Sequence, residues 1–170
     1  MSEIIKQSKQ LTDEEGARLF GWGDDPFGAT GFHIANRPPE LHFVLAANGL
    51  AMSHMSGVHA EVIVGEQTLL VGGIGGVVTR GDAQGKGYAG RLLRHAVAFF
   101  KSEWKVDAGM LFCFERLVPY YAAQGWQLIE SPVLIEQPAG QVEYPARAMM
   151  LPIGSSQWPQ GAVQVNGLPW

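Results

Sequence analysis

The glycine-rich segment at residues 84–89, Gln-Gly-Lys-Gly-Tyr-Ala, is the part of the sequence whose residue types point most directly to chemistry. It leads into residues 88–104, where apolar side chains recur at the spacing of an amphipathic helix. The first turn of a helix carries unpaired N–H groups and a partial positive charge, and therefore favours a phosphate. Small residues at Gly85, Gly87 and Ala89 would let the backbone approach that phosphate without side-chain collision. The segment predicts a phosphate-binding loop that opens a helix.

Two common phosphate-binding motifs fit this segment poorly. A P-loop has four residues between its first glycine and Gly-Lys-Ser/Thr, whereas three residues separate Gly81 from Gly85, and Gly87 occupies the Ser/Thr position. Gly85, Gly87 and Gly90 match the dinucleotide-binding spacing, but residues 80–84 separate them from the strand that the first glycine should close. A glycine turn that binds no ligand is a further interpretation.

The segment resembles motif A of the GNAT acetyltransferases, in which Gln/Arg-x-x-Gly-x-Gly/Ala follows a strand and opens a helix. Residues 84–89 match this pattern, and the aliphatic residues 77–79 stand at the usual distance before it. The resemblance implies acetyl-CoA as the cofactor, with its pyrophosphate held by loop amides and its pantetheine arm paired with the main chain of Val77 and Thr79. The implied cofactor-binding residues are Val77, Val78, Thr79, Gln84, Gly85, Lys86, Gly87, Tyr88 and Ala89.

A second motif lies at residues 117–126 and resembles the aromatic-Tyr-x-x-x-Gly-aromatic end of the family's fourth helix. Gly125 would be the left-handed residue that ends the helix. Attack of an amine on a thioester expels a thiolate, whose conjugate acid has a pKa of about 8.5, and a phenol can protonate it. The resemblance implies this role for Tyr121, and an N–H near Val77 or Val78 would polarise the thioester carbonyl. Half-buried packing is the alternative role for Tyr121.

Within this superfamily, the sequence resembles the aminoglycoside 2′-N-acetyltransferases in the Gly-Asp-Asp loop at residues 23–25, in His54, and in Trp170 as the last residue. In those enzymes the terminal carboxylate and early-loop acids contact the cationic acceptor. The resemblance therefore implies Trp170, Asp24 and Asp25 as acceptor contacts, since carboxylates are suitable partners for ammonium groups. A solvated loop and a packed tail are the alternative interpretations.

The catalytic base is not evident, because Gly75 stands where those enzymes carry a glutamate. Water could serve, or a base could be unnecessary for an amine of low pKa. His54, His59 and Glu115 lie on or beside expected strands and are further candidates, although strand histidines are usually packing residues. Cys113 is expected to be a small buried hydrophobe. The five histidines show no metal-ligand spacing, so no metal is expected.

The pattern along the chain predicts elements that would position these residues. Asn48-Gly49 is a strong hairpin turn. The expected strands are 41–47, 50–58, 60–64, 69–79, 108–114, 126–130 and 144–152, and the expected helices are 11–20, 88–104 and 117–123. This order indicates an α/β or α+β fold with a single mixed sheet. The resemblance implies the GNAT acyl-CoA N-acyltransferase fold, a twisted mixed β-sheet flanked by helices.

Composition limits the number of domains, the partners and the cellular location that the sequence allows. A chain of 170 residues fits a single domain, residues 1–170, and its one cysteine permits no internal disulfide. The net charge of −4 disfavours a nucleic-acid partner and is compatible with a cationic small molecule. No apolar stretch suits a membrane span or signal peptide, which predicts a cytoplasmic protein. Aromatic residues of the early loop and the tail could line an acceptor pocket or form a homodimer interface.

The sequence therefore predicts an N-acetyltransferase that moves acetyl from acetyl-CoA to a primary amine of a small molecule by direct attack. An aminoglycoside 2′-N-acetyltransferase and a non-catalytic acyl-CoA-binding module are the alternatives. Gly75, in place of the glutamate, favours the module, whereas Tyr121 opposes it.

Overall fold

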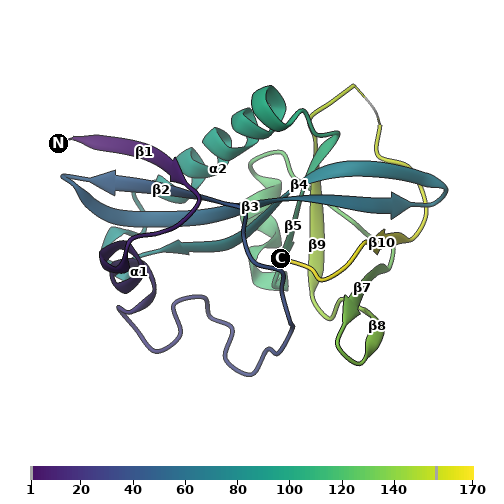
Figure 1. Ribbon diagram of the computed structural model, residues 1–170, viewed down its shortest axis with the longest axis horizontal. Helices are drawn as coiled ribbons and strands as arrows, with labels where there is room; N and C mark the ends of the chain where they lie inside the picture. The colour runs from purple at the N-terminus through teal and green to yellow at the C-terminus, as the bar shows by residue number, and fades with distance from the viewer. Residues whose placement is uncertain (1, 156) are drawn as a thin grey trace.

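The described strands form one mixed β-sheet with helices against it (Figure 1). The computed structural model describes residues 2–155 and 157–170. Its strand order is β6-β9-β5-β4-β3-β10-β7-β8, and β2 pairs with both β1 and β3. The elements are β1 Glu3–Ser8, α1 Asp13–Phe20, β2 Leu41–Ala47, β3 Leu50–Val64, β4 Gln67–Thr79, α2 Tyr88–Phe99, β5 Ala108–Cys113, α3 Val118–Ala122, β6 Gln127–Leu128, β7 Val133–Gln137, β8 Gly140–Glu143, β9 Arg147–Pro152 and β10 Val163–Val165.

Local turn and cap chemistry explains the boundaries that the sequence predicts well. Asn48 and Gly49 have φ values of 51° and 78°, as the predicted tight hairpin between β2 and β3 requires. Thr12 caps α1: its hydroxyl accepts from the Glu15 N–H at 3.1 Å, and the Glu15 carboxylate accepts from the Thr12 N–H at 3.0 Å. These side chains satisfy backbone groups that the helix itself leaves unpaired.

Several elements differ from the sequence prediction because pairing partners distant in the sequence decide them. The expected strands 50–58 and 60–64 are one strand, β3, whose first part pairs with β2 and whose last residues pair with β10. Strands β1, β7, β8 and β10 were not predicted, and β1 is a largely exposed edge strand. The expected long helix leaves α geometry at Phe100 and continues as a π-helical turn to Trp104.

The two faces of the sheet carry different helices. Phe43 and Leu45 of β2 belong to the core cluster that contains the buried side of α2. Val44, between them, packs instead with Leu19 of α1, as the alternation of side chains along a strand requires. Figure 1 shows α2 along one side of the sheet, and α1 with the 21–40 loop on the other.

The feature of the sheet that matters most for the site is the separation of β4 from β5. These strands pair in parallel only where Val71–Ile74 meets Ala108–Leu111. Beyond Ile74, β4 contains a bulge at Gly76, which has a φ of 56°, and its register with β3 shifts there. The two strand ends therefore diverge and leave a gap in the middle of the sheet.

Candidate functional site

A cavity of about 1030 Å³ lies at this gap. Its walls come from the 21–40 loop, the diverging ends of β4 and β5, the glycine loop before α2, and α3. Tyr144, Ala146 and Trp170 complete the lining from the C-terminal part of the chain. The cavity thus joins segments that are far apart in the sequence.

The glycine loop presents bare backbone to this cavity. Gly85 and Gly87 have φ values of 79° and 76°, which favour glycine, and nothing lies within 4 Å of where a Cβ would stand on either. Gly87 is the N-cap of α2 and makes no side-chain cap bond to the amides of the first turn. These amides and the open space before them fit a phosphate group.

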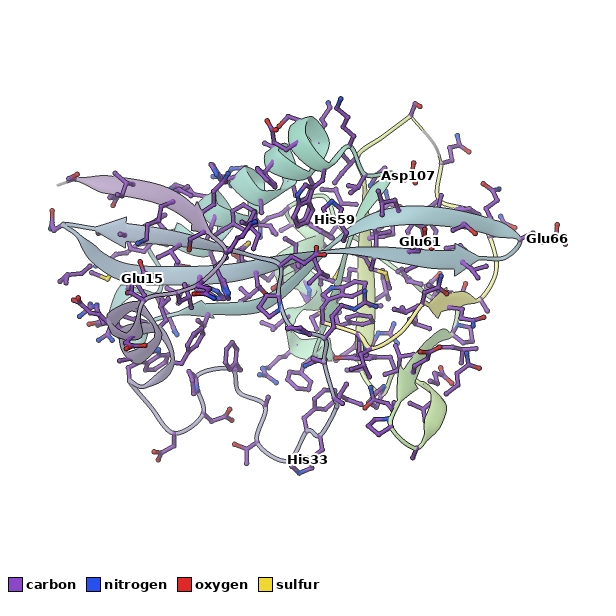
Figure 2. All side chains as sticks on the ribbon, viewed as in Figure 1. Glu15, His33, His59, Glu61, Glu66 and Asp107 are labelled. Carbon is purple, nitrogen blue, oxygen red and sulfur yellow. The ribbon has the colours of Figure 1, made fainter. Side chains whose placement is uncertain are left out.

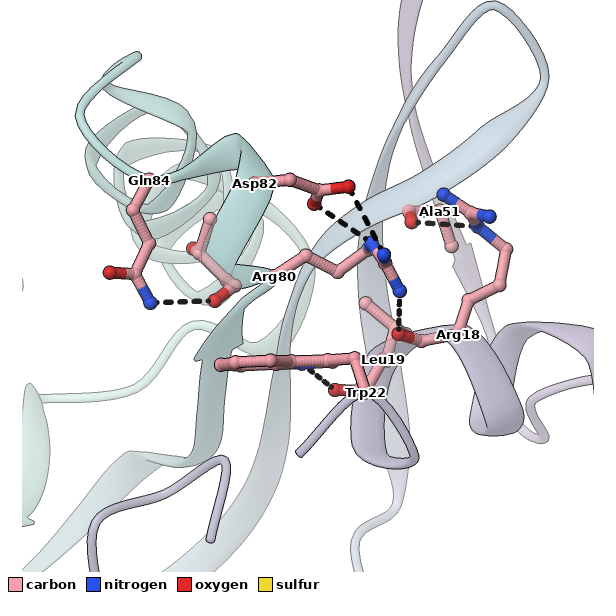
Figure 3. Close-up of polar contacts among 8 residues, drawn as sticks. Arg18, Leu19, Trp22, Ala51, Arg80, Asp82 and Gln84 are labelled. Carbon is pink, nitrogen blue, oxygen red and sulfur yellow. Dashed lines mark hydrogen bonds and ion pairs between the residues drawn. The ribbon is translucent and has the colours of Figure 1, made fainter. Parts of the chain in front are cut away.

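Side-chain contacts around the preceding turn hold this loop in place (Figure 3). The Arg80 guanidinium contacts both carboxylate oxygens of Asp82, at 3.0 and 3.1 Å, and donates to the main-chain oxygen of Arg18 at 2.7 Å. The Gln84 side chain donates to the Thr79 carbonyl at 3.1 Å. The loop is therefore fixed both to the end of β4 and to α1.

The structure brings nearly all of the implied cofactor-binding residues to one cavity. Val77, Val78, Thr79, Gln84, Gly85, Gly87, Tyr88 and Ala89 line it. Lys86 does not; it faces a neighbouring hollow of about 450 Å³, together with Arg91 and Arg94 of α2. A contact between Lys86 and a ligand would therefore be made from outside the main cavity.

Tyr121 lies on the wall of the same cavity and is 5% exposed. Gly125 has a φ of 94°, which confirms its predicted left-handed conformation at the end of the helix. Burial raises the pKa of Tyr121 above its ordinary value, so the phenol keeps its proton at neutral pH. Burial likewise raises the pKa of Cys113, which also lines the cavity, to about 11. Cys113 is thus a buried thiol, as predicted.

The three candidate bases do not line the cavity. His54 is buried behind β4, where its Nδ1 lies 2.6 Å from the Gly76 carbonyl oxygen. His59 stacks on Trp104 with ring centroids 3.8 Å apart, and Figure 2 shows it at the sheet, below α2 in that view. Glu115 is exposed and pairs with Arg147 at 3.1 Å. Burial lowers the pKa of His54 to about 4, which makes it neutral at physiological pH.

The two acidic residues expected to bind the acceptor occupy different places relative to the cavity. Asp24 does not line the cavity. Asp25 does, but its carboxylate accepts from the Ala29 N–H at 2.8 Å and from the N–H and hydroxyl of Thr30 at 3.0 and 2.7 Å. These bonds lower the pKa of Asp25 and fold the loop, so its oxygens are already occupied.

Trp170 lies in the cavity wall against β4. A Cβ on Gly73 would come within 2.4 Å of its ring, and a Cβ on Gly75 would come within 3.2 Å of its main chain. The Arg37 guanidinium lies 5.5 Å from the centre of its ring. Glycine at position 75 thus leaves room for Trp170.

Comparison with known proteins agrees with this architecture. A model of the acetyltransferase (GNAT) domain matches residues 33–129, more than half of the chain. The chain belongs to the GNAT acetyltransferase family. No curated protein matches it in sequence.

Solved GNAT structures share the fold at low sequence identity. A GNAT family acetyltransferase from Brucella melitensis, in complex with acetyl-CoA, is 17% identical over 94% of each chain, with a TM-score of 0.59. A GNAT family N-acetyltransferase (YhbS) from Escherichia coli, in complex with CoA, is 14% identical over 96% of this chain and 89% of that one, with a TM-score of 0.62. The ribosomal-protein-S18-alanine N-acetyltransferase from Escherichia coli is 17% identical over 91% and 97%, with a TM-score of 0.53. These matches confirm the predicted fold class; the closer resemblance to aminoglycoside 2′-N-acetyltransferases stays a prediction.

The structure also reveals site residues of this GNAT that sequence reasoning missed. Phe112 and Phe114 lie at the end of β5 and line the cavity, as do Arg116 and Tyr144. Phe112 and Phe114 lie at the carboxyl end of a parallel strand, where ligands often bind, so their position in the sequence could have marked them as candidate site residues. Tyr144 offered no such signal. Among the described residues, no helix is long and apolar enough to cross a membrane, and no cluster of three metal-ligating side chains occurs.

The stability of this GNAT is expected to fall as the pH is lowered from 6.5 toward 4, because His54 has a pKa of about 4 when folded and 6.5 when unfolded. In that window the unfolded state binds more protons, so the stabilisation is present above pH 6.5 and lost below it. The full difference between the two pKa values of His54 corresponds to about 3 kcal/mol in the free energy of unfolding. Urea unfolding across this range should show a smaller loss for His54→Asn. Equal slopes for both proteins would contradict the assignment to His54.

Proposed function

We propose that this GNAT protein transfers the acetyl group of acetyl-CoA to a primary amine of a small molecule. The observation that carries this proposal is a single cavity bordered by the open glycine loop, the diverging end of β4 and the Tyr121 side chain. The structural neighbours from Brucella melitensis and Escherichia coli that contain acetyl-CoA or CoA support it.

The surroundings of the glycine loop suit a phosphorylated ligand. α2 is a twelve-residue helix whose first-turn amides have no side-chain cap. Beside it, Lys86, Arg91 and Arg94 line the hollow; the Arg91 guanidinium pairs with the Glu3 carboxylate at 2.6 Å, so Lys86 and Arg94 supply the net positive charge. Helix amides and cations both stabilise phosphate oxygens, so the diphosphate would lie at the loop and the remaining phosphate near the hollow.

In this proposal, acetyl-CoA supplies the thioester, and the protein positions it and moves one proton. The Val77 N–H would stabilise charge on the carbonyl oxygen, because Val77 has no register partner in β3 and lines the cavity. Tyr121 would donate its phenol proton to the sulfur as the N–C bond forms and the C–S bond breaks. The surplus proton of the amine would pass to water, from which the phenolate regains its own.

A buried phenol with a raised pKa can serve as this acid because its acceptor is buried too. A thiolate released into water has a conjugate acid of pKa about 8.5. In this cavity burial raises the pKa of the Cys113 thiol to about 11. A CoA thiolate released beside it would bind a proton more tightly than in water for the same reason, which favours transfer from Tyr121.

The lining away from the glycine loop favours an acceptor with an apolar body. The rings of Phe32 and Phe114 lie 5.0 Å apart, and those of Phe112 and Tyr144 lie 4.2 Å apart. Among the described residues that line the cavity, the charged side chains are Asp25 and Arg116. Asp25 is bonded to its own loop, and Arg116 donates to the Gly28 carbonyl at 3.1 Å. An aminoglycoside, with several ammonium groups, would find no free side-chain carboxylate among these described lining residues.

Calorimetric titration with acetyl-CoA and a free-thiol assay over an amine panel would test the proposal. The matched pair is 2-phenylethylamine and 1,5-diaminopentane, which have similar reach but end in a ring and in a second charge. Burial of the ring should raise kcat/KM for 2-phenylethylamine by roughly 10- to 100-fold. Preference for the diamine or for kanamycin would reject the apolar acceptor but keep the acetyltransferase. Absence of acetyl-CoA binding would reject the whole proposal.

The same assays address the second candidate, a non-catalytic acyl-CoA-binding module. Glycine at position 75, and the placement of His54, His59 and Glu115 outside the described cavity lining, favour this candidate. It predicts acetyl-CoA binding without thiol release for any amine.

A further inference from the structure

The peptide group between Gly76 and Val77 lies in the bulge of β4, where the register with β3 is interrupted and beyond the last residue paired with β5. The register of β3 with β4 passes from Ser56 opposite Gly75 to His54 opposite Val78, and neither Gly76 nor Val77 has a partner. Gly76 has a φ of 56°, which places the bulge in the left-handed region. Because neither residue has a register partner in β3 or β5, a side-chain contact can set the direction of this peptide group.

The His54 side chain provides that contact. Its Nδ1 lies 2.6 Å from the Gly76 carbonyl oxygen, and the residue is 2% exposed. A carbonyl oxygen only accepts, so His54 Nδ1 carries the hydrogen. His54 Nε2 of the neutral ring must then accept, and its partner is His42 Nδ1 at 2.9 Å. The edge contact with Phe20, with ring centroids 5.2 Å apart, further restricts the imidazole.

Anchoring this carbonyl also sets the direction of the next amide. The peptide bond is planar and trans, so its C=O and N–H point in opposite directions. The Gly76 carbonyl faces His54, which does not line the cavity. The N–H of the same peptide group, which belongs to Val77, therefore points away from His54, on the side where Gly76 and Val77 line the cavity.

We propose that His54 is a positioning residue for acetyl transfer: through its bond to the Gly76 carbonyl, and held by His42, it directs the Val77 N–H toward the thioester carbonyl oxygen. This inference rests on the proposed function. His54 itself touches neither the acetyl donor nor the amine. Its effect is confined to one amide, so its loss should slow the reaction with little change in acetyl-CoA affinity, which depends mainly on the glycine loop.

Two substitutions separate positioning from packing. His54→Leu fills similar space without a donor, whereas His54→Asn keeps an N–H donor near the position of Nδ1. His59→Leu is the matched control, because His59 lies on the same strand but pairs with Glu40 and stacks on Trp104, away from the cavity. The acetyl-CoA Kd, kcat and the thermal unfolding midpoint are measured for each variant.

A spectroscopic readout tests the amide directly. Isotope-edited infrared spectra of bound [1-13C]acetyl-CoA report how strongly a hydrogen bond polarises the thioester carbonyl. His54→Leu is expected to lower kcat by roughly 10- to 100-fold, which does not exceed the loss of kcat when a whole oxyanion-hole donor is removed. It should also move the frequency of the thioester carbonyl stretch toward its value in solution. His54→Asn should recover a large part of both, and His59→Leu should match the parent protein.

The outcomes distinguish this inference from the proposed function. If the parent protein binds and turns over acetyl-CoA but His54→Leu keeps its kcat and carbonyl stretch, or His54→Asn is as impaired as His54→Leu, the positioning role is overturned. If the parent protein does not bind acetyl-CoA, both proposals fall. If His54→Leu does not fold, His42→Leu replaces it: release of the imidazole should shift kcat and the stretch in the same direction, and unchanged values would overturn the role.

Discussion

Replacement of Gly87 by glutamate is expected to abolish acetyl-CoA binding, with a Kd raised by 100-fold or more, roughly the effect of losing a buried charge-assisted contact. Gly87 borders open space at the N-terminus of α2, so a glutamate carboxylate there would occupy the first-turn amides and repel the diphosphate. Isothermal titration with acetyl-CoA measures the loss, and circular dichroism shows whether the fold is kept.

The left-handed conformation of Gly87 calls for two controls. Any side chain at a φ of 76° costs about 1 kcal/mol, so Gly87→Ala gives the effect of strain alone. Gly140→Glu places the same side chain at another open, positive-φ glycine, the first residue of β8, outside the cavity lining. Both controls should bind acetyl-CoA. An unchanged Kd for Gly87→Glu would show that the loop does not hold the diphosphate.

Tyr121→Phe is expected to lower kcat by roughly 100-fold or more while leaving the acetyl-CoA Kd nearly unchanged. Phenylalanine retains the ring that packs beside Trp126, with centroids 6.5 Å apart, and removes only the hydroxyl. Because burial raises the pKa of Tyr121, the parent enzyme should lose no activity through ionisation of this phenol at neutral or mildly alkaline pH. Stopped-flow or steady-state thiol release measures the rate.

Tyr120→Phe is the matched control for this substitution. Tyr120 is adjacent in sequence, also lines the cavity and is 42% exposed, so its hydroxyl has water as an alternative partner. Its loss should change kcat by no more than about twofold, as is usual for surface groups outside the chemistry. A Tyr121→Phe enzyme with the parent rate would exclude the phenol as the general acid.

The sequence alone determined the features that depend on neighbouring residues. Asn48 and Gly49 specify their hairpin because both accept positive φ, and Gly125 ends α3 for the same reason. Gly85 and Gly87 likewise specify the exposed loop before α2. In each case the backbone conformation follows from the residue types within a few positions, so it could be read directly.

Only the tertiary structure decided which residues line the cavity and which, like His54, contact the lining residues without reaching the cavity. β10 joins the sheet between β3 and β7, and Trp170 lies against Gly73 and Gly75, although these contacts link distant parts of the chain. The bond between His54 and the Gly76 carbonyl depends on a register shift that no local pattern specifies. Such contacts form when packing brings separate strands together, and their geometry is set by the sum of many weak interactions rather than by any one segment.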